Sequence, residues 1–128
     1  WKTQMQLIHD RAEGYFFIRA IRDEAVVIID RELRASFLIA PDRIVEAWPI
    51  ARVDDLDAAA VQVILDQHPE VAILGTGRRQ QFPDKALLLP LLRQGIGVEV
   101  MDNSAAGRTY NLLAGEGRKV VAAFILPG

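Results

Sequence analysis

The loop from Gly75 to Arg79 carries residue types that can bind an anion. It reads, in order, Gly75, Thr76, Gly77, Arg78 and Arg79. Glycine has no Cβ, so the backbone N–H groups of Gly75 and Gly77 can turn toward an anion, and Arg78 adds positive charge. The alternative is a plain glycine turn with its arginines in solvent, which is the commoner meaning of so short a pattern. A dinucleotide fingerprint and a P-loop are both excluded, because a glutamine stands where the third glycine belongs and no Gly-Lys-Ser/Thr follows.

A second polar loop, Asp102–Ser104, follows the next buried apolar run. Asp102 or Asn103 could orient a substrate or accept a proton. Asp, Asn and Ser in front of a helix also serve as ordinary caps for its unpaired N–H groups, and this is the favoured interpretation. Arg108 would emerge from the first turns of that helix, and Tyr110 would follow it two residues later.

The sequence contains no other recognisable catalytic or metal-binding pattern. It has no cysteine, which excludes disulfides, thiolate nucleophiles and cysteine metal sites. His9 and His68 have no partner at metal-ligand spacing and are interpreted as structural or solvated. Neither Ser36 nor Ser104 has the context of a nucleophile elbow. We therefore assign no catalytic residue, metal or cofactor, although these patterns alone do not exclude an enzyme.

The two loops require a strand–helix–strand framework in the second half of the chain. Predicted strands are Val71–Leu74, Val98–Met101 and Val120–Ile125, and predicted helices are Lys85–Arg93 and Ser104–Ala114. A further helix, between aspartate caps at 54–57 and Pro69, is predicted from the spacing of Val61, Ile64, Leu65 and His68. This alternation favours right-handed crossovers and a parallel sheet segment. If the first two strands are neighbours, both loops face one crevice beyond their carboxyl ends, where ligands of such sheets tend to bind.

The first half of the chain is rich in β-forming residues. Strands are predicted over Tyr15–Ile21, Ala25–Ile29, Arg34–Ile39 and Ile44–Trp48. The polar residues 22–24 join the first two strands into a hairpin. This hairpin carries apolar side chains on both faces, which predicts that it is covered on both sides. They are Phe16 and Ile18 on one face, and Phe17 and Ile21 on the other.

The composition limits the classes of protein to which the chain can belong. With 128 residues, 51% of them hydrophobic, the chain can bury a core as a single domain over residues 1–128 without metal or disulfides. Fifteen basic and seventeen acidic residues give a net charge of −2, which argues against a dedicated nucleic-acid binder. No apolar run approaches the roughly 20 residues of a membrane-spanning helix, so we expect a cytoplasmic protein that does not insert into a membrane. The chain begins with Trp1, and residues 1–4 could be an extension ahead of Met5.

The carboxyl half resembles a widespread single-domain family, the Mth-type family of largely unknown function. The resemblance covers Gly14 to Ile125, is most specific after Val71, and is most distinctive in the "RTYN" and "EGR" motifs at 108–111 and 116–118. Eukaryotic members include the mitochondrial respiratory complex I assembly factor 3 and the adipogenesis-associated Mth-type domain protein. The resemblance implies an α/β fold of three layers, in which a β-rich N-terminal portion packs on a mixed central sheet. In the family pattern, cysteine or another small residue stands where this chain has Gly107, so glycine removes any thiol chemistry there. Threonine is common where this chain has Asn103, and asparagine can still cap a helix.

The resemblance implies a binding role, so the leading hypothesis is a non-enzymatic binding or assembly module linked to respiratory complex I. It would have a protein partner, no nucleic acid, and membrane association only peripherally through that partner. The alternative is a protein or enzyme that takes a small anionic metabolite in a pocket at the strand ends. Glu116 and Arg118 are expected to pair with each other or with Arg108. The candidate surface comprises Gly75, Thr76, Gly77, Arg78, Asp102, Asn103, Arg108 and Tyr110.

Overall fold

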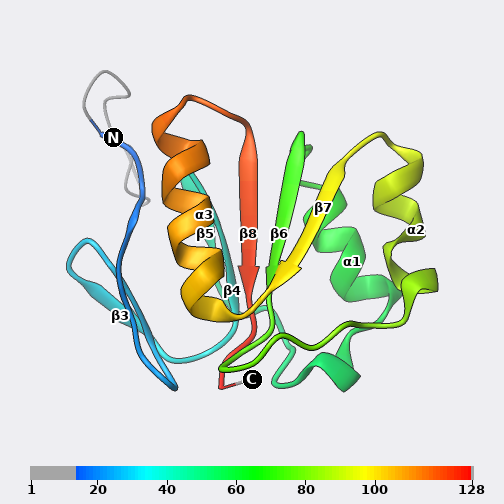
Figure 1. Cartoon of the computed structure of the whole chain (residues 1–128), viewed down its shortest axis with the longest axis horizontal. Helices are drawn as coiled ribbons and strands as arrows, with labels where there is room; N and C mark the ends of the chain where they lie inside the picture. Colours follow the sequence, from blue (N-terminus) through cyan, green and yellow to red (C-terminus); the bar gives the residue numbers. More distant parts are fainter. Residues whose placement is uncertain (1–13, 128) are drawn as a thin grey trace.

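The fold is built on a five-stranded mixed sheet, seen in a computed structural model that describes residues 14–127 (Figure 1). The sheet order is β5-β4-β8-β6-β7, with β4 at Phe37–Ala40, β5 at Arg43–Val45, β6 at Val71–Gly75, β7 at Gly97–Met101 and β8 at Val120–Phe124. A separate three-stranded sheet has the order β1-β2-β3, with β1 at Ile18–Ile21, β2 at Val26–Ile28 and β3 at Arg31–Leu33. The helices are η1 at Val53–Asp55, α1 at Ala58–Leu65, α2 at Lys85–Arg93 and α3 at Asn103–Gly115. Residues 1–4 and His9 lie outside the described residues.

The parallel part of the sheet is where the sequence predicts it. Strand β6 pairs in parallel with β7 on one side and with β8 on the other, whereas β4 pairs with β8 antiparallel. Helix α2 connects β6 to β7, and α3 connects β7 to β8. Because β6 and β7 are parallel neighbours, the loops that follow them leave the sheet at the same end, the carboxyl ends of these strands (Figure 1). None of the helices in residues 14–127 has the length and apolar content needed to cross a bilayer.

Two layers cover the two faces of this sheet, which confirms the predicted three-layer α/β fold. Alternate residues of each strand enter different cores, as the two-residue period of a strand requires. In β6, Ala72 and Leu74 pack in the core beneath α1 and α2, whereas Ile73 packs in the core beneath α3 and the small sheet. Strand β8 is buried at every position, because it lies at the centre of the sheet.

Aspartate caps and glycine stops set the helix boundaries. Carboxylate oxygens of three N-cap residues accept hydrogen bonds from backbone N–H groups in the first turns, which satisfies donors that a helix start leaves unpaired. The pairs are Asp57 with Ala60 (2.9 Å), Asp84 with Ala86 (2.9 Å) and Asp102 with Ala105 (2.8 Å). Gly95 and Gly117 follow α2 and α3 with φ of 77° and 80°, a backbone conformation that favours glycine.

Four predictions for the framework are wrong, the fourth of them at Trp48. The predicted strand Arg34–Ile39 is a strand only from Phe37 onward, where it forms β4, and the preceding strand β3 ends at Leu33 and belongs to the other sheet, with the buried Ser36 between the two strands. The Ser36 hydroxyl donates to the carbonyl of Ile50 and accepts from the N–H of Leu126 (2.8 Å), which fixes the chain between the two strands. The second face of the hairpin is not covered at Phe17, which is 38% exposed, although Ile21 of that predicted face packs against the core beneath α3. His68 does not extend the buried stripe of α1, because that helix ends three residues earlier and the imidazole is exposed.

Trp48 also lies outside any strand, because β5 ends at Val45. Its side chain is buried, and Nε1 donates to the carbonyl oxygen of Ala60 in α1 (3.1 Å). The indole therefore secures the loop after β5 against the helix layer, as the polar end of a buried tryptophan usually does when it finds a partner.

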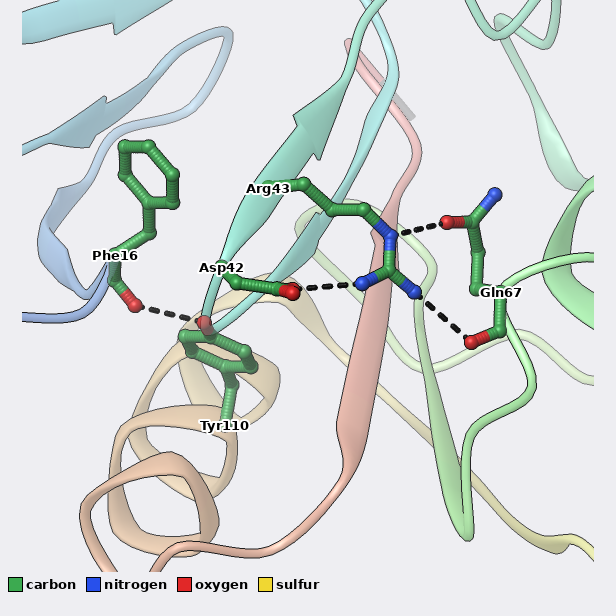
Figure 2. A network of polar contacts seen from close by, with 5 residues as sticks. All are labelled: Phe16, Asp42, Arg43, Gln67 and Tyr110. Carbon is green, nitrogen blue, oxygen red and sulfur yellow. Dashed lines mark hydrogen bonds and ion pairs between the residues drawn. The ribbon is translucent and has the colours of Figure 1, made fainter. Parts of the chain in front are cut away.

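The small sheet is fastened to α3 by side chains of the "RTYN" motif. The buried hydroxyl of Tyr110 donates to the carbonyl oxygen of Phe16 (2.7 Å), as Figure 2 shows. Asn111 accepts from the N–H of Ile18 (2.8 Å) and donates to its carbonyl oxygen (2.8 Å), so its amide takes the place of a neighbouring strand at the edge of β1. Gly107 permits this approach, because a Cβ there would lie 3.1 Å from a side-chain carbon of Ile21.

We expect Gly107→Ala to destabilise the fold by about 1–2 kcal/mol, although alanine favours a helix over glycine by about 1 kcal/mol. The added methyl group would push against Ile21 and Ile18 of β1. Urea unfolding measures the difference. The matched control is Gly115→Ala, whose Cβ meets only the hydroxyl of Tyr15 at 3.2 Å, the far end of a flexible side chain. Equal stability of the two variants would contradict the close packing of β1 on α3.

Candidate interaction surface

The loop after β6 is a tightly bonded turn. Thr76 is fully buried, and its hydroxyl donates to the carbonyl oxygen of Arg79 (2.6 Å) and accepts from the N–H of Gln81 (3.0 Å). Its N–H donates to the carbonyl oxygen of Met101 (3.0 Å), and the N–H of Gly77 donates to Asn103 (3.0 Å). These backbone donors are already used inside the protein. The geometry therefore favours the glycine turn over the anion cradle.

Asn103 joins the ends of three strands. Its Oδ1 accepts from Gly77, and its Nδ2 donates to the carbonyl oxygen of Ile125 just after β8 (3.1 Å). Its own N–H donates to the carbonyl oxygen of Gly77 (2.8 Å). A Cβ on Gly75 would lie 2.4 Å from Asn103 Oδ1, so glycine is needed at the end of β6 to admit the amide. Asn103 is thus a buried structural bridge, and Asp102 beside it is the cap that the sequence favours.

The eight residues predicted as a surface divide by accessibility. Five are buried, one is half-buried and two are exposed. The buried five are Gly75, Thr76, Gly77, Asn103 and Tyr110, the half-buried one is Asp102, and the exposed two are Arg78 and Arg108. The buried polar groups bond to the backbone of neighbouring elements, and the two exposed candidates are both cations.

Arg78 and Arg108 line adjoining hollows between β1 and the amino-terminal half of α3. One hollow, of about 290 Å³, includes Arg108, and the other, of about 230 Å³, includes Arg78. They share Ile21 and Ser104. We call this surface the arginine groove and define it by four cations that line it: Arg19, Arg22, Arg78 and Arg108.

Positive charge dominates the arginine groove. Asp23 is the acidic residue among its lining, and it pairs with Arg78 at 3.4 Å. Both side chains are 72% exposed, so water screens this ion pair and its contribution to stability is small. Arg22 contacts Glu32 more distantly, at 3.8 Å. The groove is therefore suited to a negatively charged ligand or partner segment.

A separate hollow of about 260 Å³ lies at the opposite ends of β6 and β8, beside Arg43. Figure 2 shows the guanidinium of Arg43 donating to Asp42 Oδ1 (2.6 Å), to Gln67 Oε1 (2.6 Å) and to the Gln67 carbonyl oxygen (2.9 Å). These bonds tie β5 to the turn that follows α1. The role of Arg43 is accordingly structural, and its donors are directed at the protein itself.

Glu70 lies near the same end, and it is the partner of Arg118. The predicted pairing of Arg118 with Glu116 is wrong, since Arg118 Nε donates to Glu70 Oε1 (3.1 Å). The N–H of Lys119 also donates to that carboxylate (3.0 Å), and these two bonds hold the pKa of Glu70 below its ordinary value. The resulting stabilisation is present at neutral pH and is lost as the pH falls through the pKa of the folded state.

Three groups at these sites were missed by the sequence reasoning. Asn111 was in the "RTYN" motif, but its partner, Ile18, is 93 residues away in sequence. Arg19 and Arg22 belong to the hairpin, and nothing local indicates that β1 lies beside α3.

Comparison with known proteins agrees with this fold. The chain belongs to the family described as "Protein of unknown function (DUF498/DUF598)", which matches residues 18–125. It is 27% identical over 128 residues to the human protein named NADH dehydrogenase [ubiquinone] 1 alpha subcomplex assembly factor 3, covering 98% of this chain and 69% of that protein.

Solved bacterial structures share the whole architecture. A Xanthomonas campestris protein has 40% identity and a TM-score of 0.82, covering 94% of this chain and 91% of the other. A Bordetella pertussis protein described as an Mth938-like domain has 32% identity and a TM-score of 0.80, covering 95% and 92%. The resemblance to the Mth-type family is thereby confirmed.

We expect Asn103→Asp to lower the free energy of unfolding by about 2–4 kcal/mol, because a carboxylate cannot donate to Ile125 and its charge would be buried. The control is the reverse exchange next to it, Asp102→Asn, which keeps an N-cap oxygen and should change stability by no more than about 1 kcal/mol. Urea unfolding at neutral pH measures both. Similar losses in the two variants would show that Asn103 does not act as a bridge.

Proposed function

We propose that this chain is a protein-binding module that acts in the assembly of a respiratory enzyme of the complex I type. One observation carries the proposal: similarity to a protein named as a complex I assembly factor extends over 98% of the chain. A similarity of that extent includes both sheets and all three helices. The proposed setting is the cytoplasm.

The arginine groove is the surface we propose for the partner. Of the candidate residues, Arg78 and Arg108 are reachable, and they share this surface with two further arginines. A partner segment with exposed Asp or Glu side chains would match the charge and would be guided to the groove by electrostatic attraction. Arginine also offers planar paired donors for carboxylates, which gives directional binding.

The internal bonding of the remaining candidates favours binding over catalysis. Thr76, Asn103 and Tyr110 use their polar atoms to hold loops and strands together. Within residues 14–127 there is no group of three or more His, Asp and Glu residues placed to hold a metal ion. The arginine groove therefore presents positively charged side chains to a partner.

We predict that an Arg78→Ala/Arg108→Ala variant loses at least about tenfold in partner affinity, since arginines are frequent hot spots whose removal costs about 1–2 kcal/mol or more each. Crosslinked pull-downs from the native host, membranes included, measure the recovery of respiratory-complex subunits. Near-ultraviolet circular dichroism first confirms that the variant is folded.

The matched control is Arg34→Ala/Arg52→Ala. It removes two arginines of similar exposure, 68% and 67%, whose ion-pair partners are nearby surface acids. This control should recover the same subunits as the unmodified protein. If the groove variant recovers as many respiratory-complex subunits as the control, the interface lies elsewhere on the molecule. If none of the three proteins recovers these subunits, the proposed assembly function is wrong.

A further inference from the structure

Helix α2 presents apolar side chains to solvent at the outer side of the molecule. It lies beyond the edge strand β7, away from the small sheet (Figure 1). Of its leucines only Leu91 is buried, whereas Leu89 is 39% and Leu92 is 51% exposed. Phe82, three residues before the helix, is 72% exposed. Leu89 and Leu92 are three residues apart and therefore lie on the same side of the helix.

Positive charge brackets this apolar face. Lys85 begins the helix and Arg93 ends it, and the residues between them are apolar or proline. Neither cation forms an ion pair with any residue of the described range 14–127. Lys85 stands in the first turn, where a cation opposes the helix dipole. Its charge therefore does not serve the stability of α2.

A second copy of the chain does not match this face. If two α2 helices packed antiparallel, Lys85 of each would face Arg93 of the other, and a parallel pair would place like residues together. Either arrangement brings cation against cation beside an apolar contact, which costs free energy. A partner that covers this face of α2 must instead offer negative charge at its rim and apolar groups between the charges.

An anionic bilayer surface has that layout, with phosphates outside and acyl chains directly beneath. Helices that lie in the headgroup region carry Leu and Phe on one side and Lys or Arg beside them. Long basic side chains can reach the phosphates while their stems stay among apolar groups. The short helix α2 has both features, apolar side chains and cations beside them, and it would lie at the bilayer surface without crossing it.

We propose that α2 is a peripheral membrane-binding helix, with Phe82, Leu89 and Leu92 at the acyl boundary and Lys85 and Arg93 on lipid phosphates. This contact is made by the chain itself. It uses a different surface from the arginine groove, so the molecule can hold a membrane and a protein partner together.

Co-sedimentation with vesicles tests the proposal. The full chain is mixed with vesicles of phosphatidylcholine alone, or of phosphatidylcholine and phosphatidylglycerol in equal parts. The unmodified protein should sediment with the anionic vesicles and much less with the neutral ones. Lys85→Gln/Arg93→Gln should weaken anionic binding about thirtyfold, since each basic residue contributes a factor of about five at such a surface. Leu89→Gln/Leu92→Gln should weaken binding to a similar degree or more.

Two controls separate this helix from general charge and general hydrophobicity. Arg34→Gln/Arg52→Gln removes the same charge from two exposed arginines outside both α2 and the arginine groove and should keep most of the vesicle binding. Leu112→Gln removes a leucine of 63% exposure from α3 and should keep it as well. If the unmodified chain stays in solution with anionic vesicles, the proposal is wrong and an acidic protein segment becomes the occupant of choice. Equal losses in the control and α2 variants would also overturn it.

Discussion

The contact between the small sheet and α3 is the constraint on which the arrangement of the surface depends. Without it, the face of the central sheet that holds Phe37, Ile39 and Phe124 would be covered by α3 alone. An isolated sheet of three short strands has little stability of its own, and it gains stability when its apolar face packs against another element. Tyr110 and Asn111 supply hydrogen bonds where β1 meets the helix, and Gly107 supplies the space. The same contact creates the arginine groove, because both of its hollows are lined by residues of β1 together with residues of α3.

The most distinctive residues of the sequence thus have structural roles, and the residues suited to contact a partner lie next to them. Within the "RTYN" motif, Tyr110 and Asn111 face inward, whereas Arg108 faces solvent. A single motif can therefore position a surface and contribute to it. This division fits the proposed binding role, because side chains that are held rigidly lose less conformational freedom when a partner binds.

Much of the second half of the fold follows from the sequence. Buried apolar strands alternate there with helices that begin at aspartate and end near glycine, and both signals are local. The division at Ser36 was not predictable, because its partners Ile50 and Leu126 are 14 and 90 residues away. Asn103 and Tyr110 were predicted as site residues for the same reason. Their polar side chains could take part in binding or catalysis, and the partners that give them a structural role are remote in the chain. Periodicity also could not reveal the exposed side of α2, since almost every position of that helix is apolar.

Amide hydrogen exchange in Asn111→Ala tests the central claim most directly. If the Asn111 amide fastens the small sheet to α3, the amides of β1, β2 and β3 should exchange at least about tenfold faster in the variant, because these strands open together as one unit. Amides of β6 and β8 should keep their protection. Faster exchange at Ile18 alone, or an equal loss of protection across β6 and β8, would contradict the account.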